Sequence, residues 1–237
     1  MERSIEFNNA GVCCVEEGDH KAAWDLFKGA LELKLAAERT SMNGGGDGPQ
    51  QELPKNKYIE KAEAQYAKRK SHPKSLDHSP RSVTYLQDNC HPQRQELSRR
   101  QMEWAPDVLD SPFLFTHAMR LERDTDMSTR KQSATIIFNL AIVDHLKNRL
   151  SEQAVSLYEL AMTLLAGDVV DLLGISLMNN MGVWCYENGD MDGAMACMAH
   201  LAGFMVSCSS IDQAQKDGIQ SNIIWLTYPP SPASPAA

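Results

Sequence analysis

Apolar side chains recur at helical spacing in three parts of the chain. In each part a stripe at i, i+3, i+4 precedes a turn signal, and a second stripe at i, i+4, i+7 follows it. This is the pattern of two antiparallel helices whose small residues permit close approach. The stripes comprise Phe7, Ala10, Gly11, Cys14, Ala23, Phe27 and Ala30 in the first part; Ile137, Leu140, Ala141, Ala154, Tyr158 and Ala161 in the middle part; and Met178, Met181, Gly182, Cys185, Ala194, Met198 and Leu201 in the third.

The first and third parts are also copies of each other. Residues 8–23 and 179–194 are identical at nine of sixteen positions without a gap. Both contain a Gly-Asp dipeptide, which suits the end of one helix and the cap of the next. In the middle part the turn is one residue longer, and Ser151 is a good N-cap. Such self-similarity indicates a repeat architecture and favours binding over catalysis.

Helical spacing is lost between the first and middle parts. Residues 43–51 break the periodicity, and several prolines between 73 and 112 prevent long elements. A short helix over 55–70 would place Tyr58, Ala62 and Tyr66 on one side, but we expect residues 40–111 as a whole to be a low-complexity, disordered insertion. Apolar residues then alternate over 112–121, which predicts an extended segment lying along the helical body.

The pattern therefore predicts an all-α chain. Its expected organisation is a first hairpin in residues 1–39, the insertion, and the extended segment with two further hairpins and a capping helix in 112–226, before a disordered tail over 227–237. We expect the first hairpin to pack directly on the second, because a lone hairpin cannot bury its apolar face. The helices are predicted at about 3–17, 20–39, 131–147, 151–166, 170–187, 191–206 and 212–225.

These stripes resemble the tetratricopeptide repeat (TPR) family, in which an apolar–small pair in the first helix is followed by A-x-x-x-F-x-x-A in the second. The resemblance covers about half of the chain and implies a right-handed helical-hairpin solenoid of three divergent repeats plus a C-terminal capping helix. Cys14, Asp144 and Cys185 stand where the family has Trp or Tyr, and the family's terminal Pro is absent. The spacing from Ala141 to Gly182 also exceeds the family period.

The resemblance also implies a peptide-binding groove. Asn9, Asn139 and Asn180 each stand two residues before the small residue of a first helix, a position that faces the concave side in the family. A carboxamide there can hold the backbone of an extended peptide, because it carries both a donor and an acceptor. Hydrogen bonding within the solenoid is the alternative. The expected groove residues are Asn8, Asn9, Val12, Asn139, Asn179, Asn180 and Val183.

No neighbour of these asparagines in the first helices is basic. The Lys and Arg side chains that hold a terminal carboxylate in the family's chaperone-tail clamp are therefore missing. Binding of an acidic C-terminal tail is disfavoured, and a ligand of apolar or basic character suits the lining better.

Charge adds one alternative function. The chain has a formal net charge of −8, but residues 55–100 carry 11 basic and 5 acidic side chains. Such a tract can bind nucleic acid, serve as a nuclear address or fold back on the acidic helices, although few aromatic residues accompany it for base stacking. A solvated linker is the more common reading, so nucleic acid is a weaker expectation than a protein partner.

Motifs for catalysis and metal binding are missing from the sequence. The six cysteines show neither C-x-x-C nor zinc-like spacing, which predicts a reducing compartment with no metal and no cofactor. The repeat begins close to Met1 and no apolar run reaches membrane-spanning length, so we expect a cytoplasmic protein without signal peptide or membrane contact, with the nucleus as the alternative location. The expected function is a non-catalytic scaffold or adaptor for another protein, with an unrecognised enzyme as a second alternative; the oligomeric state stays open.

Overall fold

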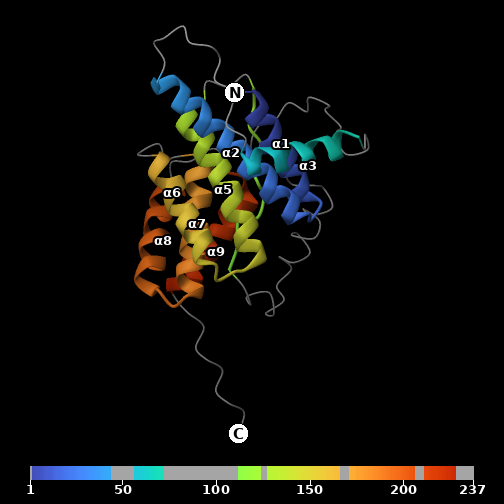
Figure 1. Cartoon of the computed structure of the whole chain (residues 1–237). Helices are drawn as coiled ribbons and strands as arrows, with labels where there is room; N and C mark the ends of the chain where they lie inside the picture. The colour runs from blue at the N-terminus through green and yellow to red at the C-terminus, as the bar shows by residue number, and fades with distance from the viewer. Residues whose placement is uncertain are drawn as a thin grey trace. The chain divides into compact units, whose positions relative to one another are not determined.

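The computed structural model describes residues 2–43, 56–71, 112–123, 127–165, 171–205 and 211–227. Every regular element in these ranges is an α-helix, which confirms the all-α class. None of the described helices has the length and apolar character needed to cross a membrane. The helices are α1 (Glu2–Glu16), α2 (His20–Asn43), α3 (Lys57–Lys70), α5 (Thr129–Lys147), α6 (Glu152–Leu165), α7 (Leu172–Glu187), α8 (Met191–Met205) and α9 (Gln213–Thr227) (Figure 1).

The chain divides into two compact units. Unit 1 comprises residues 1–81 and 116–167 and contains α1, α2, α3, α5 and α6. Unit 2 comprises residues 82–115 and 168–237 and contains α7, α8 and α9. The extended segment is shared, since residues 112–115 belong to unit 2 and residues 116–123 to unit 1. The predicted disordered tail beyond Thr227 and most of the predicted insertion lie outside the described residues.

In unit 1, α1 and α2 form the first predicted hairpin. All seven residues of its two stripes are buried. A Cβ on Gly11 would lie 2.6 Å from the ring of Phe27, so only glycine admits that ring. Gly18 ends α1 with φ +79°, in the left-handed region that glycine adopts freely, and the Asp19 carboxylate accepts a hydrogen bond from Ala22 N (3.0 Å) to cap α2.

The middle hairpin, α5 and α6, is built as the stripes predict. All six stripe residues of this part are buried, and the Ser151 hydroxyl accepts a hydrogen bond from Ala154 N at 3.3 Å, as an N-cap does. α2 packs against α5, and Leu26, Phe27 and Ile136 share one hydrophobic core. The first hairpin therefore packs directly on the second, as expected.

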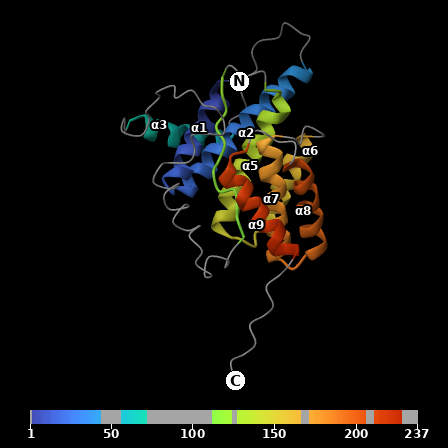
Figure 2. The ribbon, with the colours of Figure 1, turned by 180° about the vertical axis from the view of Figure 1, so that it is seen from behind.

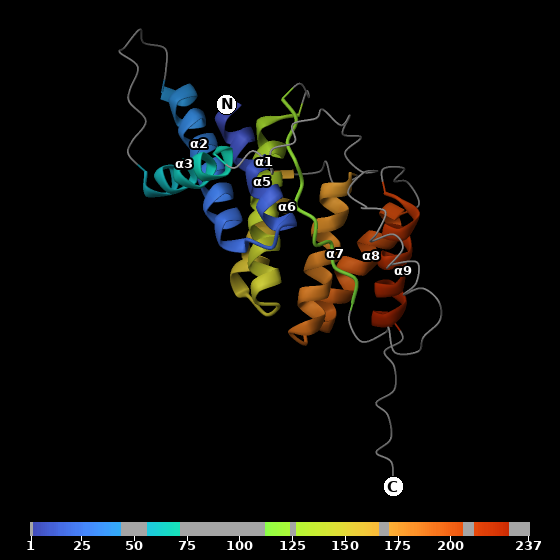
Figure 3. The same cartoon turned by 90° about the vertical axis from the view of Figure 1, so that its right-hand side faces the viewer.

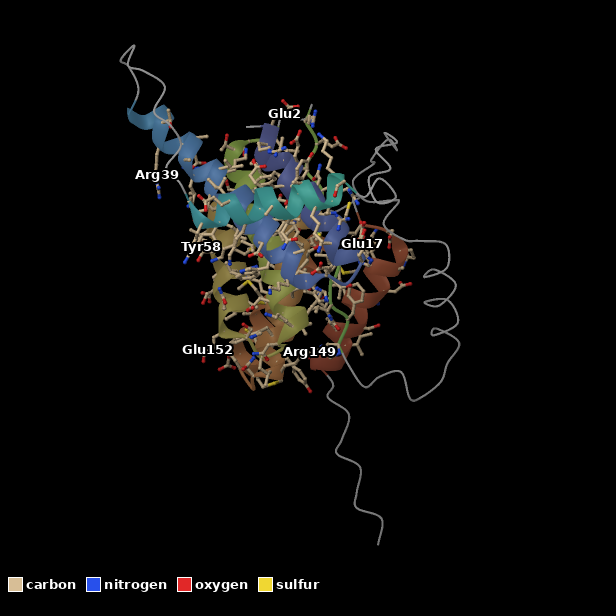
Figure 4. The ribbon with its side chains drawn as sticks, turned by 45° about the vertical axis from the view of Figure 1, so that its right-hand side comes forward. Glu2, Glu17, Arg39, Tyr58, Arg149 and Glu152 are labelled. Atoms are coloured by element: carbon tan, nitrogen blue, oxygen red, sulfur yellow. The ribbon has the colours of Figure 1, made fainter. Side chains whose placement is uncertain are left out.

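The insertion is not structureless throughout. α3 begins after Asn56, whose side chain caps Tyr58 N (2.9 Å), and packs across α1 and α2 (Figure 4). The Arg69 guanidinium donates to both carboxylate oxygens of Glu17, at 2.7 and 2.8 Å. The expectation that residues 40–111 are disordered as a whole is therefore wrong for Lys57–Lys70, and the short helix considered over 55–70 is confirmed. These residues bury Ala62, and their two ends bond to Glu32 of α2 and to Glu17 after α1.

In unit 2, the hairpin of α7 and α8 repeats the first one in detail. Gly189 has φ +79°, and Asp190 accepts from Gly193 N at 3.0 Å. A Cβ on Gly182 would lie 2.4 Å from the terminal methyl of Met198, as Gly11 meets Phe27 in the first copy. The predicted capping helix is α9, which packs on α8 and α7.

Close approach of α3 and α2 depends on Gly29. A Cβ at this position would lie 2.3 Å from Ala62 Cβ and 3.2 Å from Tyr58 O. We expect Gly29→Ala to lower the free energy of unfolding by about 1–3 kcal/mol, because overpacking forces α3 outward. Denaturant unfolding of the full chain measures this. Gly203→Ala on α8 is the control: nothing lies within 4 Å there, so helix propensity should stabilise by about 0.5–1 kcal/mol. Equal effects at both positions would contradict the packing.

A buried histidine makes unit 1 sensitive to acid. His145 on α5 is fully buried, and its Nδ1 lies 3.1 Å from the hydroxyl of Tyr158 on α6. Burial, with a smaller contribution from Arg149 and against the effect of Asp144, lowers the pKa of His145 from 6.5 to about 4. The folded state therefore binds a proton less readily than the unfolded state.

Stability should accordingly be greatest above pH 6.5 and fall as the pH drops toward 4, because only the unfolded chain is protonated in that window. The loss from His145 is at most about 3 kcal/mol, the equivalent of the pKa difference. Chemical unfolding at a series of pH values measures it. His145→Gln should flatten this part of the profile, whereas His200→Gln, an exposed position on α8, should not. An unchanged profile in His145→Gln would contradict the assignment.

Candidate peptide-binding site

In unit 1, asparagines from two helices hold the backbone of the extended segment. Asn9 on α1 accepts from Leu121 N (2.8 Å) and donates to Leu121 O (2.7 Å). Asn139 on α5 does the same with Met119, at 2.7 and 2.8 Å. Residues 116–123 run as an extended trace beside these helices (Figure 2). Each carboxamide therefore satisfies both backbone groups of one residue, at alternate positions of the segment.

A third carboxamide links the two. Asn8 on α1 donates to Met119 O (3.0 Å), and its oxygen accepts from the amide of Asn139 (2.9 Å). The Asn8 and Asn139 side chains are fully buried. The orientation of each amide follows from its backbone partners, since an N–H can only donate and a carbonyl can only accept.

Unit 2 repeats these contacts on residues 112–115, the part of the extended segment that runs beside α7 (Figure 3). Asn180 on α7 accepts from Phe115 N (2.9 Å) and donates to Phe115 O (3.0 Å). Asn222 on α9 pairs with Phe113 N and O, both at 2.8 Å. Asn179 donates to Phe113 O (3.0 Å) and accepts from Asn222 (2.8 Å), as Asn8 does with Asn139 in unit 1.

Asn222 is the functional residue that sequence reasoning missed. The sequence pattern predicts only a capping role for the helix that carries it. In unit 2, however, Asn222 makes the contacts that Asn139 makes in unit 1. The available signal was an asparagine followed by apolar residues, in Asn222–Ile224 as in Asn139–Ala141. It was weak because α9 has no following helix of the described chain that would complete a repeat.

The five predicted asparagines thus hold an extended backbone, and their occupant is residues 112–123 of the same chain, called the strap below. Within each unit the structure shows the asparagines bound to the chain's own strap. Binding of another protein's peptide stays a prediction. Val12 and Val183 are buried, and Val12 belongs to the hydrophobic core of unit 1.

Apolar side chains of the strap anchor it in addition to the asparagine contacts. In unit 1, Ala118 and Leu121 are buried in the core formed by α1, α2 and α5. In unit 2, the Phe113 ring lies against Gly218 of α9, where a Cβ would be only 2.6 Å from it, and packs edge-on with Phe115 at 5.0 Å. Backbone contacts therefore fix the path, whereas apolar side chains supply most of the burial.

Ion pairs hold the unit 1 half of the strap to α1. Arg120 Nη2 lies 2.9 Å from Glu16 Oε2. Arg123 lies 2.6 Å from Glu2 and 3.0 Å from Glu6. Burial raises the pKa of Glu6, but its pairs with Arg3 and Arg123 outweigh burial, so the pKa of this carboxyl is lowered overall and the group stays ionised.

The described residues offer little support for a metal site or a nucleic-acid site. Within them, no group of three or more His, Cys, Asp or Glu side chains could hold a metal ion. In the basic tract, the described part is α3, whose Arg69 is paired with Glu17. The remainder of residues 55–100 lies outside the described ranges.

The chain matches no protein-family model, and no curated protein or solved structure is significantly similar to it. The candidate site therefore rests on its own geometry.

The Asn139 contacts can be tested by deletion. Asn139→Ala removes three hydrogen bonds and leaves the partly buried Met119 N–H and the buried Asn8 carbonyl oxygen without these partners. We expect the free energy of unfolding to fall by about 2–4 kcal/mol. Ser156→Ala on α6 is the control, since it loses only an exposed bond to its own helix (3.0 Å) and should change stability by less than about 0.5 kcal/mol. A similarly small effect at Asn139 would show that the strap contacts are energetically unimportant.

Proposed function

We propose that this protein is a non-catalytic scaffold whose helical hairpins bind an extended peptide segment of another protein through their asparagines. The observation that carries the proposal is the paired contact of a carboxamide with the N–H and C=O of one residue, found at four positions of the strap. Every residue except proline offers these groups. The contacts therefore suit any extended chain and need no particular strap sequence.

The chemistry of the site supports binding without turnover. A carboxamide neither gains nor loses a proton near neutral pH, so it cannot serve as a general acid or base. What it does well is to fix the path and direction of a strand by two hydrogen bonds per residue. We therefore assign the asparagines a holding role.

The hairpins would act together as a divergent TPR-like solenoid of right-handed sense. The matched pairs Gly11–Phe27 and Gly182–Met198 support this arrangement, because they give the first and third hairpins the same packing. Asn222 and Asn139 make matching contacts, which suggests that α9 serves as the first helix of an incomplete further repeat.

In this proposal the strap is an internal occupant that a partner segment replaces. The asparagines cannot be left empty without a large cost, since each would lose one or two hydrogen bonds in a place largely hidden from water. A partner must therefore present an extended backbone as the strap leaves. It must also compete with a tethered strand, whose effective concentration is on the order of millimolar.

The test uses the full chain with a weakened strap. Met119→Pro removes the N–H that Asn139 accepts, and proline tolerates an extended backbone. We expect a labelled peptide with the sequence of residues 112–123 to bind this variant at least about tenfold more tightly than it binds the unaltered chain, by fluorescence polarisation. Binding should also raise the melting temperature of the variant.

The matched control is the same peptide methylated on the two backbone nitrogens that correspond to Met119 and Leu121. It keeps every side chain but cannot donate to the asparagines. Its affinity should fall by at least tenfold. Equal affinity of the two peptides, or no saturable binding of the unmodified peptide to Met119→Pro, would reject the proposed function.

A further inference from the structure

The edge of α1 beside the strap is acidic, and the strap meets it with arginine. Arg120 pairs with Glu16 near the C-terminal end of α1, and Arg123 pairs with Glu2 and Glu6 near its N-terminal end. Figure 4 labels Glu2 at one end of the helix. The strap therefore runs antiparallel to α1, with one arginine for each end of the acidic edge.

The other charges of this face are already neutralised within the fold. Arg3 of α1 pairs with Glu6 (2.7 Å) and with Glu63 of α3. Arg69 of α3 pairs with Glu17. Glu2 and Glu16 are different, because within the described residues they form ion pairs with the strap arginines. Removal of the strap would leave these two carboxylates beside the site that the strap had occupied.

Between the two arginines lies the apolar anchor. Leu121 is 2% exposed and belongs to the core, and its backbone is held by Asn9. Arg120 and Arg123 flank it at positions −1 and +2. The asparagine contacts do not distinguish one side chain from another, so in unit 1 selection among peptides depends on the buried leucine position and on the two charged positions.

The ion pairs suit selection more than affinity. The Arg120 side chain is 32% exposed and that of Arg123 is 56% exposed. Such pairs add little free energy individually and are screened by salt. An acidic residue would, however, face Glu16 at the first position, or Glu2 and Glu6 at the second, and like charges at close range are disfavoured. The difference in binding free energy between a basic and an acidic peptide is therefore larger than the contribution of either ion pair alone.

We propose that the acidic edge of α1 makes this site selective for a basic–apolar extended segment of a partner protein, with leucine at the buried position and arginine at −1 and +2. This inference rests on the proposed function and adds the chemical class of the ligand. The strap itself is the internal example of that class.

The experiment compares two peptides on the full chain carrying Met119→Pro. One has the sequence of residues 116–123, and in the other glutamate replaces both arginines. We expect the arginine peptide to bind about tenfold or more tightly at low salt, with the difference shrinking as ionic strength rises. Adding Glu2→Arg and Glu16→Arg to the chain should reverse the preference.

Glu159→Arg supplies the matched control for that reversal. Glu159 is exposed on α6, in the same unit, and changes the net charge as each edge substitution does. It should leave the arginine peptide preferred. If both peptides bind equally well to the unaltered and the reversed edge, the selectivity is refuted while backbone binding stands. If neither peptide binds any of these chains, the proposed function itself fails.

Discussion

The structure depends on one constraint, namely that a carboxamide buried inside a helical body must find both a donor and an acceptor. Asparagine is a poor helix former and costly to bury alone. Yet Asn8, Asn139, Asn179, Asn180 and Asn222 are almost completely buried in the middle of helices. They are tolerated because an extended chain lies opposite them, with its N–H and C=O groups turned toward the helices.

The strap has the converse requirement. A non-helical chain packed on helices has no ladder partners for its own backbone, and buried backbone groups are almost always paired. The asparagines pair Met119 and Leu121 in unit 1 and Phe113 and Phe115 in unit 2. The helices and the strap thus satisfy each other's hydrogen-bonding groups, and in the proposed function a competing peptide would have to offer the same backbone groups.

Much of the helical part could be read from the sequence, because it follows from local periodicity. The stripe of Phe7, Ala10, Gly11 and Cys14, its partner around Phe27, and the Gly18–Asp19 turn are all as predicted. The asparagine positions were found too, and backbone binding was weighed for them. Two features are harder to read. A short helix is one reading of residues 55–70, but α3 is polar overall and Ala62 is its one fully buried residue, so its pattern also resembles a linker. Asn222 lies in a helix that is not followed by a second repeat helix, so its sequence could not be aligned with the other repeats.

The sequence by itself determined the helices, their capping turns and the alternation of the strap, since each depends on residues close together in the chain. Only the tertiary structure decided what the asparagines hold. Asn9 and Leu121 are more than a hundred residues apart, as are Asn222 and Phe113. Contacts over such separations produce no periodic pattern in the sequence. The partner of each asparagine is a backbone group, which is the same in almost every residue and so cannot be recognised from the residue type.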